Sequence, residues 1–217
     1  MTAVDPALDF DTLILAGGRA ARMGGADKAG LAVGAAPMLV SVARAAAAAG
    51  TSRLILVGPP RPGPIEDDLA LLAAGRTGWL TWVQEEPPGS GPVAGLRCGL
   101  AEATAAWVVL LATDLPFLTA AHLTALVMAR PQAVGVVAAD TAGHSQWLTS
   151  CWHTSVLKSA LTAYGGNSLH GVLEPLNPAT IRLEATVGDP PPWLDCDTPD
   201  DLATARRARS RVEDPGG

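Results

Sequence analysis

The stretch that decides the fold is Leu15-Ala16-Gly17-Gly18-Arg19-Ala20-Ala21-Arg22-Met23-Gly24-Gly25-Ala26-Asp27-Lys28. A short apolar run, predicted as a strand over residues 12–16, leads directly into a glycine-rich loop over residues 17–34. Glycines allow backbone N–H groups to approach phosphate oxygens closely, and the basic side chains of the loop neutralise their charge. The pattern therefore predicts a phosphate-binding loop at the end of the first strand.

The lysine in this loop stands out because the chain prefers arginine. The sequence contains thirteen arginines but two lysines, Lys28 and Lys158. A lysine retained in a glycine loop indicates a need for a compact ammonium group. The alternative is a flexible surface loop with incidental charges. The stretch lacks the GxxxxGK[ST] pattern of a P-loop and the GxGxxG pattern of dinucleotide-binding folds.

Outward from this loop, apolar runs alternate with alanine-rich helical runs, which is typical of βαβ units around a mainly parallel sheet. Strands are predicted over residues 12–16, 53–57, 80–84, 107–111, 133–139 and 146–152, and helices over 37–49, 65–74, 93–103, 119–129, 155–163 and 199–209. We expect a three-layer α/β/α, nucleotide-binding Rossmann-like fold with a mostly parallel mixed sheet. Residues 11–210 would form one domain between tails at 1–10 and 211–217.

Composition narrows the class of protein. Of the 217 residues, 48% are hydrophobic and 17% charged, which excludes a disordered chain. The formal net charge is −6 and no basic stripe is present, so a nucleic-acid partner is not expected. Cys98, Cys151 and Cys196 form no CxxC pair, and neither a signal peptide nor a membrane-spanning run is recognised. We expect a cytoplasmic protein without a membrane partner, and the oligomeric state stays open.

The glycine-rich loop resembles that of the molybdenum cofactor guanylyltransferase-like (MobA-like) nucleotidyltransferases, which open with a strand followed by LAGGxxxRMGxDK. This chain has one additional glycine before Ala26-Asp27-Lys28. The resemblance implies that Leu15, Ala16, Gly17 and Gly18 enclose the nucleotide. It also implies that Arg22 and Lys28 contact the phosphates and take part in catalysis.

A second matching segment follows the predicted third strand, in Glu85-Glu86-Pro87-Pro88-Gly89-Ser90-Gly91-Pro92-Val93-Ala94-Gly95-Leu96, and is similar to the family's stretch of an acidic residue and GPLAG. A carboxylate there can accept hydrogen bonds from N1 and N2 of guanine, and spacing favours Glu85 over Glu86. The resemblance assigns Gly91 and Gly95 to the acceptor side. The alternative for Glu85 is an exposed acidic turn.

Two further segments carry acids suited to a metal ion. Asp114, in Thr113-Asp114-Leu115-Pro116, ends a predicted strand where open α/β sheets bind ligands, and an oxygen ligand there suits Mg²⁺. The alternative for Asp114 is a helix cap or turn. Near the C-terminus, Asp195 and Asp197 alternate in Trp193-Leu194-Asp195-Cys196-Asp197-Thr198-Pro199, so their side chains project to one face. Asp197 is the more probable second metal contact, and both acids could approach the acceptor.

The resemblance implies Mg²⁺-dependent transfer of GMP from GTP to a phosphorylated acceptor, molybdopterin or its molybdenum-loaded form, with release of pyrophosphate. Guanylyl-specific members often carry asparagine where this chain has Asp195 and Asp197. After the second strand, Val57-Gly58-Pro59-Pro60 offers backbone carbonyls but no side-chain donor to the base. CTP as donor, another small phosphorylated acceptor, or a non-catalytic nucleotide-binding protein are therefore the alternatives.

Overall fold

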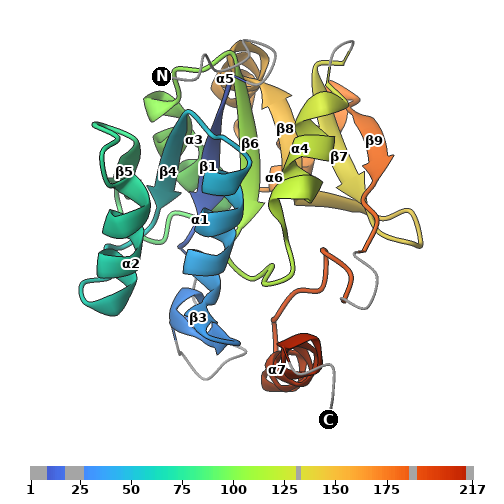
Figure 1. The fold of residues 1–217 in the computed structure, drawn as a ribbon. Coiled ribbons are helices and arrows are strands. Elements are labelled where there is room, and N and C mark those ends of the chain that lie inside the picture. The colour runs from blue at the N-terminus through green and yellow to red at the C-terminus, as the bar shows by residue number, and fades with distance from the viewer. Residues whose placement is uncertain (1–8, 18–26, 131–132, 186–189, 214–217) are drawn as a thin grey trace.

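The computed structural model describes residues 9–17, 27–130, 133–185 and 190–213. Its centre is a seven-stranded sheet in the order β5-β4-β1-β6-β8-β7-β9 (Figure 1). The strands are β1 (Phe10–Leu15), β4 (Arg53–Val57), β5 (Leu80–Val83), β6 (Trp107–Ala112), β7 (Gly135–Ala139), β8 (Ser145–His153) and β9 (Ala179–Arg182). Both pairings of β8, with β6 and with β7, are antiparallel, and the other pairings of this sheet are parallel. The predicted mixed, mostly parallel sheet is confirmed.

Helices cover both faces of the sheet and complete three layers (Figure 1). On one face lie α1 (Met38–Ala48), α2 (Pro64–Ala73) and α4 (Ala120–Met128), and on the other α3 (Pro92–Glu102), α5 (Thr154–Ala163) and α6 (Leu169–Leu173). Along β1 the side chains alternate: Phe10 and Ile14 pack with the first set of helices, whereas Leu13 and Leu15 pack with the second. Because both faces are buried, β4 and β6 are apolar at nearly every position.

A smaller cluster lies beyond the carboxyl ends of β1 and β6. There, α7 (Pro199–Glu213) packs beside a two-stranded hairpin, β2 (Ala32–Val33) and β3 (Ala36–Pro37) (Figure 1). Val33, Phe117, Cys196 and Leu202 are among the buried members of this cluster. The C-terminal helix is thereby attached to the loop that follows β6.

The sequence did not predict several short elements. The 3-10 helix η3 (Lys28–Gly30) and β2 lie inside the predicted 17–34 loop, whereas β3 lies beyond it and includes Pro37, the predicted first residue of the following helix. Likewise α6, the 3-10 helix η4 (Glu174–Leu176) and β9 fall in the second half, where the pattern was least regular. Of the predicted tails, residues 1–8 and 214–217 lie outside the described residues, while β1 begins at Phe10 and α7 extends to Glu213. Within the described part of the chain, no helix has the length and apolarity needed to span a bilayer.

Candidate active site

The site lies at the switch point of the sheet. The chain builds β1, β4 and β5 outward in one direction and then returns to place β6 on the other side of β1. The strand order thus reverses at β1, whose two neighbours in the sheet are β4 and β6. Open α/β sheets bind ligands in a crevice at the carboxyl ends of the strands at such a point, and the region around the carboxyl ends of β1 and β6 is called the crevice for this reason. Lys28 follows β1, and Asp114 follows β6.

Three predicted residues meet in this crevice. The Lys28 ammonium donates to Asp114 Oδ2 at 2.5 Å and also to Asp197 Oδ1. Asp197 comes from the segment before α7, so residues distant in sequence converge on one point. The side chains of Lys28 and Asp114 are 18% and 19% exposed, whereas that of Asp197 is 45% exposed and forms the open side of the cluster.

The charges of this cluster act on one another. Burial alone would lower the pKa of Lys28, but its hydrogen bonds to Asp114 and Asp197 outweigh that effect and raise the pKa above its ordinary value. Partial burial raises the pKa of Asp195, and the negative charges of Asp197 and Asp114 raise it further. Lys28 thus stays cationic. Asp195, although it is exposed to solvent, is close enough to Asp114 and Asp197 to be affected by their negative charges.

The donor set fits a divalent cation. The carboxylates of Asp114 and Asp197 converge on a single positive group, here the Lys28 ammonium, and carboxylate oxygens are ligands that Mg²⁺ prefers. Mg²⁺ is usually held by one or two carboxylates together with substrate phosphates. The described residues contain no cluster of three or more His, Cys, Asp or Glu side chains that could hold a metal ion.

The wall of the crevice is formed where the loops after β1 and β4 touch. Ala16 donates its N–H to Val57 O at 2.7 Å, and Leu15 is buried. Gly58 has a φ of +144°, and a Cβ at this position would lie 2.7 Å from the Gly17 nitrogen. Only glycine permits this approach. Gly18 and Arg22, which were also predicted to contact the nucleotide, lie outside the described residues.

Glu85, the acid predicted to bind the base, lies in the loop that follows β5. Glu85 is partly buried and accepts the Gly89 N–H at 2.9 Å through Oε1, while Glu86 is exposed. Gly95 is buried in α3, and a Cβ there would lie 3.2 Å from Val57 and 3.9 Å from Glu85 Oε2. Gly91 precedes α3 with a φ of 97°. Gly95 therefore lets α3 approach the sheet beside Glu85.

Sequence reasoning missed Arg61. It follows Val57-Gly58-Pro59-Pro60, the stretch in which no side-chain donor was found, and it donates to Asp27 and to Ala16 O. The sequence did show a basic residue directly after the loop that follows the second predicted strand. Its partners could not be inferred, because they lie 34 and 45 residues away in sequence.

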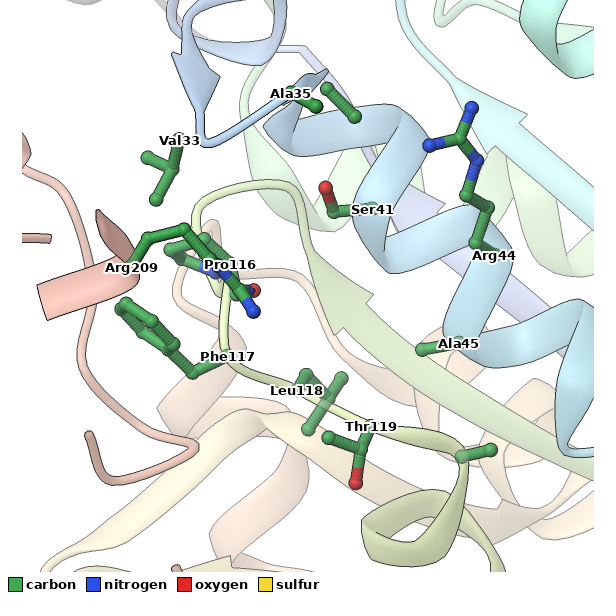
Figure 2. A pocket seen from close by; sticks show the side chains of 12 residues that line it. Val33, Ala35, Ser41, Arg44, Ala45, Pro116, Phe117, Leu118, Thr119 and Arg209 are labelled. Carbon is green, nitrogen blue, oxygen red and sulfur yellow. The ribbon is translucent and has the colours of Figure 1, made fainter. Parts of the chain in front are cut away.

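A cavity of about 410 Å³ lies on the α1 and α7 side of the loop after β6. Figure 2 shows Arg44 and Arg209 at opposite sides of it, with Phe117 beside Arg209. Arg44 pairs with Asp68, and Arg209 donates to Pro116 O and stacks on Phe117. The two arginines of this cavity are thus directed to the protein itself.

Comparisons with known proteins show the family and the fold of the chain. Residues 12–181 match the family described as MobA-like NTP transferase domain. The chain is 31% identical to a molybdenum cofactor guanylyltransferase of Bradyrhizobium sp., over 90% of this chain and 91% of the relative. It is 34% identical to a probable molybdenum cofactor guanylyltransferase of Deinococcus radiodurans, over 69% and 70%. A Methanothermobacter nucleotidyl transferase shares the fold with a TM-score of 0.74 at 19% identity, covering 94% and 99% of the two chains.

The family match and the named relatives, together with the shared fold, identify the chain as an enzyme of the nucleotidyltransferase class. Within that class, the chain belongs to the family of MobA-like NTP transferase domains. The resemblance found in the glycine-rich loop is confirmed.

Proposed function

We propose that this protein is a cytoplasmic, Mg²⁺-dependent enzyme that transfers GMP from GTP to a phosphorylated acceptor, molybdopterin or its molybdenum-loaded form, and releases pyrophosphate. The observation that carries the proposal is the convergence of Lys28, Asp114 and Asp197 at the switch point. The names of the relatives from Bradyrhizobium sp. and Deinococcus radiodurans support the donor and the acceptor.

The reaction requires little acid–base chemistry from the protein. An oxygen of the acceptor's phosphate attacks the α-phosphorus of GTP, a new P–O bond forms, and the bond to the β-phosphate breaks. Because a phosphate monoester is largely ionised at neutral pH, with a second pKa of about 6, the nucleophile needs no strong general base. This agrees with a site whose titratable side chains are two carboxylates and an ammonium.

The side chains would act mainly by positioning and by charge. Asp114 and Asp197 would hold Mg²⁺, which when bound supplies charge neutralisation at the triphosphate. Lys28 would exchange its carboxylate partners in part for phosphate oxygens, and the Leu15–Gly17 backbone would line the nucleotide. Such prearranged charges stabilise a transition state without reorganisation at the moment of reaction.

Glu85 would select the base. Guanine offers N1–H and N2–H₂ on one edge, which a single carboxylate can accept together. Of the two candidate acids, Glu85 is the better supported because it is held by the Gly89 N–H while Glu86 is exposed. Gly91, Gly95 and Asp195 would face the acceptor side.

The test is pyrophosphate release by the purified protein with molybdopterin and GTP, CTP, ATP or UTP in parallel, with and without Mg²⁺. GTP-dependent release that requires both Mg²⁺ and molybdopterin supports the proposal. Preference for CTP would overturn the guanylyl assignment and indicate a cytidylyltransferase. Release with another phosphorylated acceptor but not with molybdopterin would overturn the acceptor.

A further inference from the structure

Arg61 makes a concentrated set of contacts beside the crevice. Its Nε and Nη2 donate to the two carboxylate oxygens of Asp27 at 2.6 and 2.9 Å. Nη2 also donates to Ala16 O at 2.7 Å, and Nη1 to Pro59 O at 3.1 Å. The Arg61 side chain is 10% exposed although it belongs to a surface loop. Such a two-pronged arginine–carboxylate pair fixes orientation as well as charge.

These contacts join the end of β1 to a residue within the glycine-rich loop of residues 17–34. Ala16 is the first residue after β1, and Asp27 directly precedes Lys28. Asp27 is also the residue before η3, where an aspartate usually caps the helix with its side chain, yet it makes no such cap bond. Its carboxylate faces Arg61 instead.

The loop after β4, which carries Arg61, already lies against the end of β1. Gly58 touches the backbone at Ala16 and Gly17, so the loop after β4 is already against the loop after β1. Arg61 lies three residues beyond Gly58 and extends from this contact to Asp27. The Arg61 guanidinium thereby holds Asp27, the residue before Lys28, in a fixed position relative to the end of β1.

We propose that Arg61 is a positioning residue for nucleotide binding: it sets Lys28 at a fixed place relative to Ala16 and Gly17, so that the ammonium and the backbone face the same triphosphate. This inference rests on the binding of a nucleoside triphosphate in the crevice, which is part of the proposed function. Arg61 acts through Asp27 and Ala16, the two groups beside the crevice that its guanidinium contacts.

The test compares Arg61→Gln and Arg61→Lys with the wild type. Arg44→Gln is the matched control, because Arg44 forms an arginine–aspartate pair with Asp68 outside the crevice. Calorimetry would measure binding of GTP with Mg²⁺ and of guanosine alone. We expect Arg61→Gln to weaken GTP binding about tenfold, equivalent to one charged hydrogen bond, and to leave guanosine binding unchanged. Arg61→Lys should restore part of the loss, since an ammonium replaces the charge but not the fork.

A second measurement is independent of any nucleotide. The amides of Gly30 and Leu31 donate to Asp27 O and Lys28 O, so their hydrogen exchange reports on the segment that Arg61 holds. We expect faster exchange at these amides in Arg61→Gln and not in Arg44→Gln. Unchanged exchange together with GTP binding within about twofold of wild type would overturn the inference. If the wild type binds no nucleotide, the proposed function fails, and amide exchange still decides whether Arg61 fixes this segment.

Discussion

Asp114 is the residue whose position most directly predicts a functional effect. It lies two residues beyond β6, at the switch point, and contacts Lys28. Asp114→Asn keeps the shape but removes the charge, so we expect the fold and most nucleotide affinity to remain while kcat falls about 100-fold or more. Steady-state pyrophosphate release at saturating Mg²⁺ measures this. Asp68→Asn, which removes a paired carboxylate outside the crevice, is the control, and equal activity of both variants would exclude Asp114 from the metal site.

Glu85 allows a test of base selection by one residue. Glu85→Gln retains an oxygen that can accept the Gly89 N–H but leaves one guanine donor unmet, so GTP binding should weaken by about 1–3 kcal/mol. CTP binding should change little, because cytosine offers one exocyclic donor beside acceptors. Parallel titration of both nucleotides gives the ratio. Glu86→Gln is the matched control, and a larger loss in that variant would assign the base to Glu86.

At the scale of elements, α7 stabilises the loop that carries Asp114. Arg209 donates to Pro116 O at 2.6 Å and lies 4.8 Å from the Phe117 ring centroid. We expect Arg209→Ala to lower the free energy of unfolding by about 1–2 kcal/mol through loss of this hydrogen bond and cation–π contact. Urea unfolding measures the effect. Arg207→Ala on the same helix removes an exposed arginine and should change the free energy of unfolding little. If both variants lost the same free energy, the cause would be the helix propensity of α7 and not the contact of Arg209 with the loop.

At the scale of the whole molecule, Cys151 makes the free energy of unfolding depend on pH in the alkaline range. Burial raises its pKa from 9.0 to about 12, with the Arg130 charge opposing the shift. Above pH 9 the unfolded chain therefore releases a thiol proton that the folded chain retains, and stability falls by about 1.4 kcal/mol per pH unit until the folded pKa is reached. Urea unfolding between pH 8 and about pH 10.5 should show a smaller pH dependence in Cys151→Ala than in the wild type. Parallel curves for the two proteins would contradict this prediction.

Much of the architecture could be predicted because its signals are local. Central strands such as β4 are buried on both faces and read as continuous apolar runs bounded by turns, and Pro37 and Gly50 mark the limits of α1. The hairpin of β2 and β3 has two residues in each strand, too few to show any period. The same is true of α6, which has five residues.

The acids and the lysine of the candidate site could be predicted from the sequence, but the contacts that hold their loops in place could not. Lys28, Asp114 and Asp197 each lie in a motif with a recognisable local setting, and the structure brings them together. The contacts of Arg61 with Asp27 and of Arg209 with Pro116 depend on how distant loops approach after folding. Such pairs leave no periodic or compositional signal in a single sequence.

The late position of Asp197 has a consequence for synthesis of the chain on the ribosome. The sheet strands that frame the crevice are complete once β8 has emerged, yet the segment that supplies Asp197 follows residue 193. In a nascent chain, Lys28 and Asp114 can therefore come together before Asp197 has been synthesised. The complete cluster of Lys28, Asp114 and Asp197 forms only after the segment that precedes α7 has left the ribosome, so it assembles later than these strands.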